Sequence, residues 1–495
     1  MKNKPNIILI VMDTVRADHL SCYGYSRKTS PSIDRIARYG ALFENCFTTA
    51  TWSPPTHSSI FTGKYPSAHR TLGKNVILES WNTTLAEILS NNGYHTVGIT
   101  NCGLLAPEYG FSKGFNEYYE MYTIHELQKI LTFIKNYPNE LIRILLNGFD
   151  KHTHITNIKA KETILTIKKK QKPFFLFINY FNCHAAYDPP TPFKKKFCKN
   201  FDRARLYLIE YIMNKFNKTT EKIRSSKFNI YKLRKIAADE PETRFSFMAK
   251  ELKINKEEWD IVKSWYDGEI AYLDYHIGDL VNFLIEEGIF DNTLLIITAD
   301  HGENLGDHGL ADHHFSLYDN ILRIPLILVH ADNIPSKTRV SSIVSSIDIF
   351  PTILDIIGVK IPNGVQGLSL CPFENRKIHD FICAERGGSL TDIEVNHLRK
   401  AFSPFSHKLK HIDKGAKCIR SDTYKYILSE DGEEELYNIH EDPAEQYNII
   451  NKQREKADYL KEKMRHFLDL SYYGPKKIHH GREEIIDRLR SLGYI

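Results

Sequence analysis

Acidic and imidazole side chains follow two apolar segments of the sequence, at points where strands are expected to end. Asp13 comes directly after the apolar run 7–12, and Asp300 and His301 follow the apolar run 294–298 within two residues. In an open parallel sheet, ligands bind beyond the carboxyl ends of the strands. Carboxylate oxygens and an imidazole can bind one divalent cation, and a set dominated by oxygen favours Ca, Mg or Mn. The sequence therefore predicts a metal site built from Asp13, Asp300 and His301.

A serine at a predicted helix start is the candidate nucleophile. Pro54 and Pro55 suit the first turn of a helix, which places Ser53 at the N-cap. The positive end of the helix dipole stabilises an anionic ester. Coordination of the Ser53 oxygen to the metal could also lower the pKa of its hydroxyl enough to make it a nucleophile. Taken alone, the same pattern is also that of a serine that only caps a helix.

Short apolar strands alternate with amphipathic helices, which is typical of a parallel α/β sheet. A capping box at Thr84–Glu87 begins one helix, and the apolar positions between Leu273 and Ile285 form one face of another. The predicted strands are residues 6–12, 94–99, 174–178, 294–298 and 324–329.

The chain divides into a large domain and a smaller C-terminal part. We expect a catalytic domain over residues 1–370, with basic helical insertions near 121–170 and 194–263. The insertions are interpreted as solvated helices, or alternatively as a surface for an acidic polymer or a membrane. Residues 371–495 are expected to form an α+β subdomain, with strands near 417–419 and 424–428 and a closing basic helix.

Several segments, in the same order from residue 6 to about 450, resemble the sulfatase family of the alkaline phosphatase superfamily. They are residues 10–25, 61–66, 266–272, 298–303 and 435–443. The resemblance implies a large, mostly parallel α/β sheet flanked by helices and a metal-dependent ester hydrolase. It places Asp13, Asp300 and His301 on metal-ligand positions and Ser53 on that of the metal-bound nucleophile.

The sequence departs from the family at the nucleophile. Typical sulfatases carry Cys-x-Pro-Ser-Arg, whose Cys is oxidised to formylglycine, whereas this chain has Ser53-Pro54-Pro55-Thr56-His57. We therefore expect an unmodified serine, with His57 as a further catalytic candidate in place of the arginine. A seryl ester must be released by a second attack at phosphorus or sulfur, which favours phosphate, phosphonate or phosphodiester substrates without excluding sulfate.

The resemblance implies roles for three further residues. His184 resembles a residue that contacts the ester oxygens or protonates the leaving group. His314 falls where many members have a cationic Lys, and it could donate a hydrogen bond to a developing oxyanion. Asn101 lies roughly where the family has Gly-Lys-Trp-His and is a candidate for substrate binding. Other residues of the polar loop before His314 are expected to rim the pocket, with a second metal site as the alternative; they are His308, Asp312 and His313.

Composition excludes several classes of protein. The chain has 495 residues and a formal charge of only +5, which argues against a dedicated nucleic-acid binder. Its apolar runs are shorter than the ~20 residues of a transmembrane helix. Because its eight cysteines form no CxxC pair and its N-terminus has no signal-peptide pattern, we expect a cytoplasmic protein with reduced thiols.

Three functions remain compatible with the sequence. The leading hypothesis is a metal-dependent hydrolase of small-molecule or glycan esters, carrying sulfate or phosphate/phosphonate. One alternative is a phosphotransferase of the phosphoglycerol or phosphoethanolamine type, which hands the group to a sugar or lipid hydroxyl. The other is an inert sulfatase-like protein that binds an anionic glycan through its lysine-rich insertions.

Overall fold

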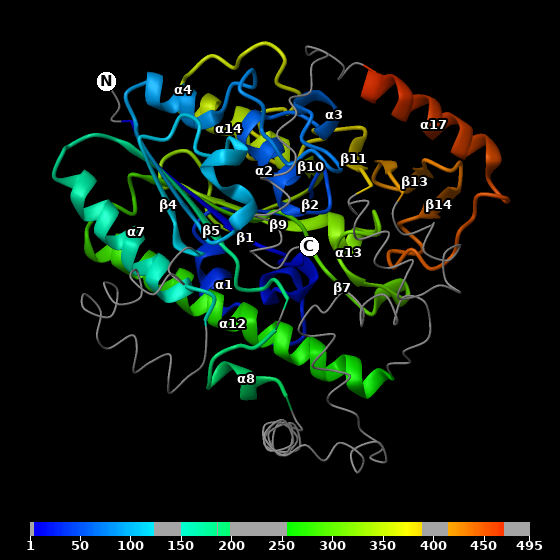
Figure 1. Cartoon of the computed structure of the whole chain (residues 1–495), viewed down its shortest axis with the longest axis horizontal. Helices are drawn as coiled ribbons and strands as arrows, with labels where there is room; N and C mark the ends of the chain where they lie inside the picture. Colours follow the sequence, from blue (N-terminus) through cyan, green and yellow to red (C-terminus); the bar gives the residue numbers. More distant parts are fainter. Residues whose placement is uncertain (1–3, 123–149, 186, 199–254, 389–413, 470–495) are drawn as a thin grey trace.

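The computed structural model describes residues 4–122, 150–185, 187–198, 255–388 and 414–469, and its largest element is a mixed sheet (Figure 1). The eight strands of this sheet follow the order β10-β2-β9-β6-β1-β5-β3-β4. Their bounds are β1 Asn6–Met12, β2 Ala41–Phe47, β3 His95–Thr100, β4 Glu117–Glu120, β5 Phe174–Tyr180, β6 Thr293–Ala299, β9 Arg323–Val329 and β10 Thr338–Ser345.

All strands of the sheet run parallel to one another except β9, which is antiparallel to β2 and β6. The central strands β1, β5 and β6 are buried along their whole length. Near-continuous apolar strands of this kind occur where helices cover both faces of a parallel sheet. The five predicted strands are confirmed, with ends that differ by up to two residues.

Helices cover the two faces of the sheet (Figure 1). One face carries α1 (Pro31–Ala37), α7 (Thr153–Lys168) and α12 (Lys256–Glu286), and the other carries α2 (Ser53–Thr62), α4 (Leu85–Asn91) and α14 (Ile349–Ile356). The predicted capping box is present, because the Thr84 hydroxyl accepts from the Glu87 amide and the Glu87 carboxylate accepts from the Thr84 amide. No helix in the described part of the chain combines the length and apolar character that crossing a membrane would need.

Parts of the two predicted insertions lie among the described residues. Helix α7 lies inside the stretch 121–170, yet it buries Ile164 and Ile167 in the main core and packs against α12 and β5. The N-terminal turns of α12 likewise lie inside 194–263. The remaining parts, 123–149 and 199–254, are outside the described residues. The predicted apolar face of α12 ends early, because Ile285 is 53% exposed in the last turn of the helix.

A second, antiparallel sheet of four strands forms the C-terminal part, in the order β11-β12-β13-β14. Helix α17 (Arg454–Asp469) packs on it through Ala457 and Leu460, and residues 470–495 lie outside the described part. The expected smaller α+β unit is therefore present. The strands are β11 Ile382–Arg386, β12 Ala416–Arg420, β13 Tyr424–Ser429 and β14 Glu434–Asn438.

A buried ion cluster joins the small sheet to the large domain. Lys425 has a fully buried side chain, and its Nζ lies 2.7 Å from a carboxylate oxygen of both Asp319 and Glu445. Arg420 adds a contact of 3.1 Å to Asp319. Burial would raise the pKa of the Asp319 carboxyl, but Arg420 and Lys425 outweigh that effect and lower it to about 2. Two cations and two carboxylates thus neutralise one another at the junction.

Replacing Lys425 with methionine should destabilise the protein by about 3 kcal/mol, because it leaves two buried carboxylates facing a single cation. Urea unfolding of the wild type and the variant measures the difference. The matched control is Lys417→Met on the adjacent strand, where a half-exposed lysine lies 3.7 Å from Glu385 and should contribute about 0–1 kcal/mol. Equal losses in both variants would contradict this account of the junction.

Candidate active site

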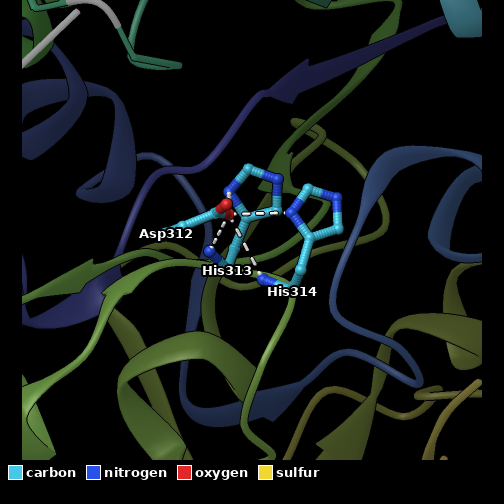
Figure 2. Close-up of side chains that lie close together, drawn as sticks. All are labelled: Asp312, His313 and His314. Carbon is cyan, nitrogen blue, oxygen red and sulfur yellow. Dashed lines mark hydrogen bonds and ion pairs between the residues drawn. The ribbon is translucent and has the colours of Figure 1, made fainter. Parts of the chain in front are cut away.

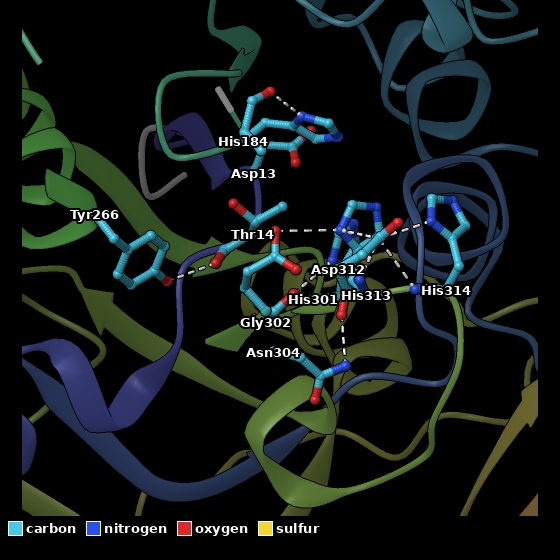
Figure 3. A network of polar contacts seen from close by, with 12 residues as sticks. Asp13, Thr14, His184, Tyr266, His301, Gly302, Asn304, Asp312, His313 and His314 are labelled. Carbon is cyan, nitrogen blue, oxygen red and sulfur yellow. Dashed lines mark hydrogen bonds and ion pairs between the residues drawn. The ribbon is translucent and has the colours of Figure 1, made fainter. Parts of the chain in front are cut away.

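The predicted metal ligands meet at the carboxyl edge of the large sheet (Figure 3). Met12 at the end of β1 pairs with Ala299 at the end of β6, so Asp13 and Asp300 follow neighbouring strands at the same level. Ligand atoms of Asp13, Asp300 and His301 lie within 4.8 Å of one another. All three side chains are fully buried. The structure therefore brings together the three residues that the sequence analysis selected.

Backbone hydrogen bonds orient Asp300 and His301. Asp300 Oδ1 accepts from the amides of Thr14, at 3.1 Å, and of His301, at 2.9 Å. The backbone of Thr14 is left-handed, with φ of 58°, which is uncommon for a residue other than glycine. His301 Nδ1 donates to the carbonyl oxygen of Gly302 at 2.9 Å. These contacts use one polar atom of each side chain and leave Asp300 Oδ2 and His301 Nε2 for another partner.

Ser53 enters the same site from the start of α2. Its Oγ donates to Asp13 Oδ2 at 3.2 Å, and its side chain is buried. The structure corrects the predicted cap by one residue, because Trp52 is the N-cap and Ser53 is the first helical residue. Pro54 and Pro55 follow within the first turn, which tolerates residues without an N–H. Ser53 thus lies beside the carboxylate group at the N-terminus of the helix.

Three atoms at this point have no hydrogen-bond partner among the described residues: Asp13 Oδ1, Asp300 Oδ2 and His301 Nε2. Burial raises the pKa of the Asp13 carboxyl well above its usual range, and the nearby Asp300 carboxylate raises it further. Burial also lowers the pKa of His301, which favours the neutral imidazole that metals bind. Two buried carboxylate oxygens and one bare imidazole nitrogen fit a divalent cation, because its charge would offset both the repulsion and the lost solvation.

His57 lies one turn behind Ser53 and is fully buried. Its Nδ1 donates to the carbonyl oxygen of Ser53 at 2.9 Å and lies 3.7 Å from Asp300 Oδ2. The ring packs edge-on against Phe177 with centroids 5.9 Å apart. The predicted catalytic role finds no support in this geometry, since His57 contacts the Ser53 backbone instead of the hydroxyl. The contacts are those of a residue that positions the start of α2.

His184 follows β5 and joins the site, as predicted. Its Nδ1 donates to the carbonyl oxygen of Ala185 at 2.7 Å, and its ring stacks on Phe181. Burial lowers the pKa of His184 to about 4, so the ring is neutral at pH 7 and Nε2 carries a lone pair. In this state His184 can accept a hydrogen bond from water or an alcohol, whereas donating a proton to a leaving group would require prior protonation.

Lys151 anchors the loop that carries His184. Its Nζ donates to the carbonyl oxygens of Asn182, at 2.8 Å, and of His184, and it lies 3.4 Å from Glu269 Oε1. Asn182 in turn accepts from Thr153 of α7 and donates to Glu269 of α12. The loop after β5 is thereby tied to α7 and α12.

Removing the Lys151 amine by Lys151→Met should lower kcat/KM by about 10²-fold, because a shift of about 1 Å in a positioning group costs that much. The matched control is Lys161→Met on α7, where the lysine pairs with Asp279 at the surface. Steady-state kinetics on the two variants, with thermal unfolding alongside, provides the measurement. Unchanged kinetics in Lys151→Met would show that the His184 loop needs no such anchor.

Asp312, His313 and His314 form a group of three consecutive residues (Figure 2) that lies next to the predicted metal ligand His301 (Figure 3). His314 Nδ1 lies 2.8 Å and His313 Nδ1 3.1 Å from Asp312 Oδ1. The His313 ring is 4.4 Å from that of His301 and 5.2 Å from that of His184, centroid to centroid. His314 is partly exposed and lies 5.7 Å from the Trp52 ring, at the mouth of the site.

The structure gives less support to the predicted roles of His308 and Asn101. His308 stacks on Tyr318 at 3.7 Å and lines a polar cavity of about 840 Å³ at the junction with the small sheet, so it does not rim the predicted metal site. Asn101 follows β3 and is buried, and its Oδ1 accepts from Thr156 of α7 at 3.0 Å. Its Nδ2 has no hydrogen-bond partner among the described residues, and its role in substrate binding stays a prediction.

Sequence reasoning missed the burial of Asp312 and His313 and the anchoring role of Lys151. The adjacency of Asp312 and His313 to His314 was a usable signal, because three ligand-type residues in a row are unusual. Lys151 had no such signal, since it stands in a lysine-rich stretch where a solvated side chain is the ordinary outcome.

Comparisons with known proteins show which family and fold this chain resembles. The family model described as Sulfatase matches residues 5–359. An arylsulfatase from Clostridium perfringens is 28% identical over 92% of this chain and 93% of its own length. An N-acetylglucosamine-6-O-sulfatase from Bacteroides thetaiotaomicron is 26% identical over 92% of this chain and 84% of its own length. The crystal structure of a phosphonate monoester hydrolase of Agrobacterium radiobacter shares the fold, with a TM-score of 0.71, 21% identity and coverage of 94% of this chain and 96% of that one.

Proposed function

This chain is an ester hydrolase that belongs to the sulfatase family, and on that premise we propose that unmodified Ser53 attacks phosphorus or sulfur esters beside one divalent cation, Ca, Mg or Mn. One observation carries the proposal: the buried atoms Asp13 Oδ1, Asp300 Oδ2 and His301 Nε2 converge without hydrogen-bond partners, next to the hydroxyl of Ser53. An inert glycan-binding protein has no physical reason to keep such a group buried without hydrogen-bond partners.

Different residues of the chain act in the two steps of the proposed hydrolysis. Asp13 Oδ2 accepts the hydrogen bond that orients the Ser53 hydroxyl. A bound cation would supply positive charge that lowers the pKa of this hydroxyl and offsets charge on the ester oxygens. Ser53 Oγ forms a bond to phosphorus or sulfur while the bond to the leaving oxygen breaks. The proton lost by Ser53 is matched by the one that the leaving oxygen gains.

Water then attacks the seryl ester, which restores the Ser53 hydroxyl and releases the phosphate, phosphonate or sulfate anion. His184 is suited to this second step, because its neutral ring offers Nε2 as an acceptor that orients the water. His314 is suited to donate a hydrogen bond to an ester oxygen at the mouth of the site. Both roles rest on placement next to the converging ligands.

Serine chemistry favours phosphorus esters over sulfate esters. A seryl ester has to be hydrolysed by a second attack, and the segment after Ser53 lacks the arginine of the usual formylglycine signal. A phosphate or phosphonate carried on a small molecule or a glycan is therefore the proposed substrate. The similarity to an N-acetylglucosamine-6-O-sulfatase supports the glycan part of this proposal.

The test compares turnover of 4-nitrophenyl phosphate and 4-nitrophenyl sulfate and determines the mass of the peptide that contains Ser53. We expect faster turnover of the phosphate and an unmodified peptide. A peptide lighter by two hydrogens, together with faster turnover of the sulfate, would replace the serine mechanism by a formylglycine one.

A cytoplasmic location with reduced cysteines is part of the proposal. All eight cysteines are free in the structure, six of them buried and Cys22 and Cys371 half-buried. Thiol titration of the denatured, non-reduced protein should count all eight. In the native protein the reaction should be slow, because burial raises the pKa of the buried thiols. A count well below eight would contradict the expected location.

A further inference from the structure

A second set of potential metal ligands lies beside the first. Asp312 and His313 are buried and His314 is one-quarter exposed. One ligand atom from each lies within 4.8 Å of the other two. Glu303 brings a further carboxylate, with its Oε2 3.4 Å from His313 Nδ1. Two imidazoles and two carboxylates thus meet in a buried pocket wall.

The backbone directs these consecutive side chains to the same place. Asp312 ends β8 (Ala311–Asp312), which pairs with β7 (Asn304–Leu305) in a short antiparallel ladder. Its φ is 74°, a left-handed value that costs energy in a residue with a Cβ. In a regular strand, neighbouring side chains would point to opposite faces. The left-handed residue breaks this alternation, and His313 and His314 both turn their Nδ1 atoms toward Asp312 (Figure 2).

Several donors therefore crowd one carboxylate oxygen. Asp312 Oδ1 has the His314 Nδ1 at 2.8 Å and the His313 Nδ1 at 3.1 Å, and the backbone amides of His313 and His314 also point to it. A neutral imidazole can move its proton to Nε2, which leaves Nδ1 free to bind a metal without net release of a proton.

We propose that Asp312, His313 and His314 form a second cation site, distinct from the one at Asp13, Asp300 and His301. Two nitrogen ligands and one oxygen ligand favour a borderline cation such as Zn²⁺, whereas the first site is richer in oxygen. Glu303 Oε2 is within reach as a fourth ligand after a small side-chain movement. A cation there would also offset the buried charges of Asp312 and Glu303.

The site has a consequence for the neighbouring chemistry. The His313 ring lies 4.4 Å from that of His301, centroid to centroid, so the two cation sites would be neighbours. An anionic ester seated between His184 and His314 would then face positive charge from two directions. The inference is independent of whether Ser53 is the nucleophile.

Metal content provides the test. Tag-free protein is stripped with a chelator, exposed to Mg²⁺ and then to Zn²⁺ or Co²⁺, desalted and analysed by elemental mass spectrometry. The wild type should hold two ions per chain, one of them Zn²⁺ or Co²⁺, and the Co²⁺ form should show an absorption band of nitrogen-ligated cobalt. His314→Ala and Asp312→Asn should lose one ion and that band.

Matched variants separate the two sites. His308→Ala, from the same loop but stacked on Tyr318, should keep both ions. Asp300→Asn should lose the ion of the first site and keep the cobalt band. Asp300→Asn could bind as many ions per chain as the wild type while His314→Ala binds fewer. That result would contradict the first cation site and support the second. A wild type that holds at most one ion, or a His314→Ala variant that holds as many as the wild type, overturns the second site.

Discussion

Ser53→Ala should lower kcat/KM by about 10⁴-fold or more, the size of effect expected when a covalent nucleophile is removed. The Ser53 hydroxyl donates to Asp13 Oδ2 and lies at the first position of α2, so the substitution removes the attacking atom with little effect on packing. Initial rates on 4-nitrophenyl phosphate measure the loss. Quenching the wild type in acid during turnover should also yield a Ser53 peptide heavier by one phosphoryl group.

The control for this variant is Ser58→Ala. Ser58 is buried in the same helix, and its hydroxyl has no hydrogen-bond partner among the described residues. The control should keep wild-type activity and stability, because it loses only an unpaired hydroxyl. Residual activity of Ser53→Ala within about tenfold of the wild type would mean that another group, or water itself, makes the attack.

Asp300→Asn should abolish binding of the first cation and lower kcat/KM by roughly 10³-fold or more, since the charge that the cation supplies contributes several kcal/mol to such reactions. Asparagine keeps an oxygen that can accept from the Thr14 and His301 amides, so the local fold should persist. Isothermal titration with Mg²⁺, Mn²⁺ and Ca²⁺ measures binding, and initial rates measure activity.

The same acid-to-amide change at Asp279 is the matched control. Asp279 pairs with Lys161 and Asn157 of the neighbouring helix α7 and should affect neither cation binding nor rate. Full activity in Asp300→Asn, or full activity of the wild type after complete chelation, would be incompatible with the proposed site.

Structural features could be predicted from the sequence where a single short segment determines the local structure. An apolar run such as Asn6–Met12 has to be a buried strand, and the residue after it has to lie at the sheet edge. Because Asp300 follows a second such run, the meeting of Asp13 and Asp300 could be predicted without knowing the strand order. The capping box at Thr84–Glu87 is equally local, and it was predicted for the same reason.

Features that depend on distant contacts could not be predicted in this way. The left-handed backbones of Thr14 and Asp312 are imposed by surrounding structure. Threonine disfavours this conformation, and aspartate only tolerates it more often than most residues do. Lys151 acquires its role only because β5, α7 and α12 place carbonyl oxygens and a carboxylate around its amine. The stretch near 121–170 was predicted to be helical, but the attachment of its residues 153–168 to the core was not, because their apolar residues are interspersed with lysines.

The pairing of β1 with β5 and β6 has a consequence for how the protein is made. The Thr14 amide bonds to Asp300 across 286 residues, so at ribosomal speeds of about 5–20 residues per second roughly 15 to 60 s separate the synthesis of these two groups. During that interval the nascent chain carries an apolar strand that lacks both flanking partners until β5 is made, and lacks β6 until the end. A growing chain of this kind should depend on chaperones, and it should gain affinity for cations only after β6 has left the ribosome.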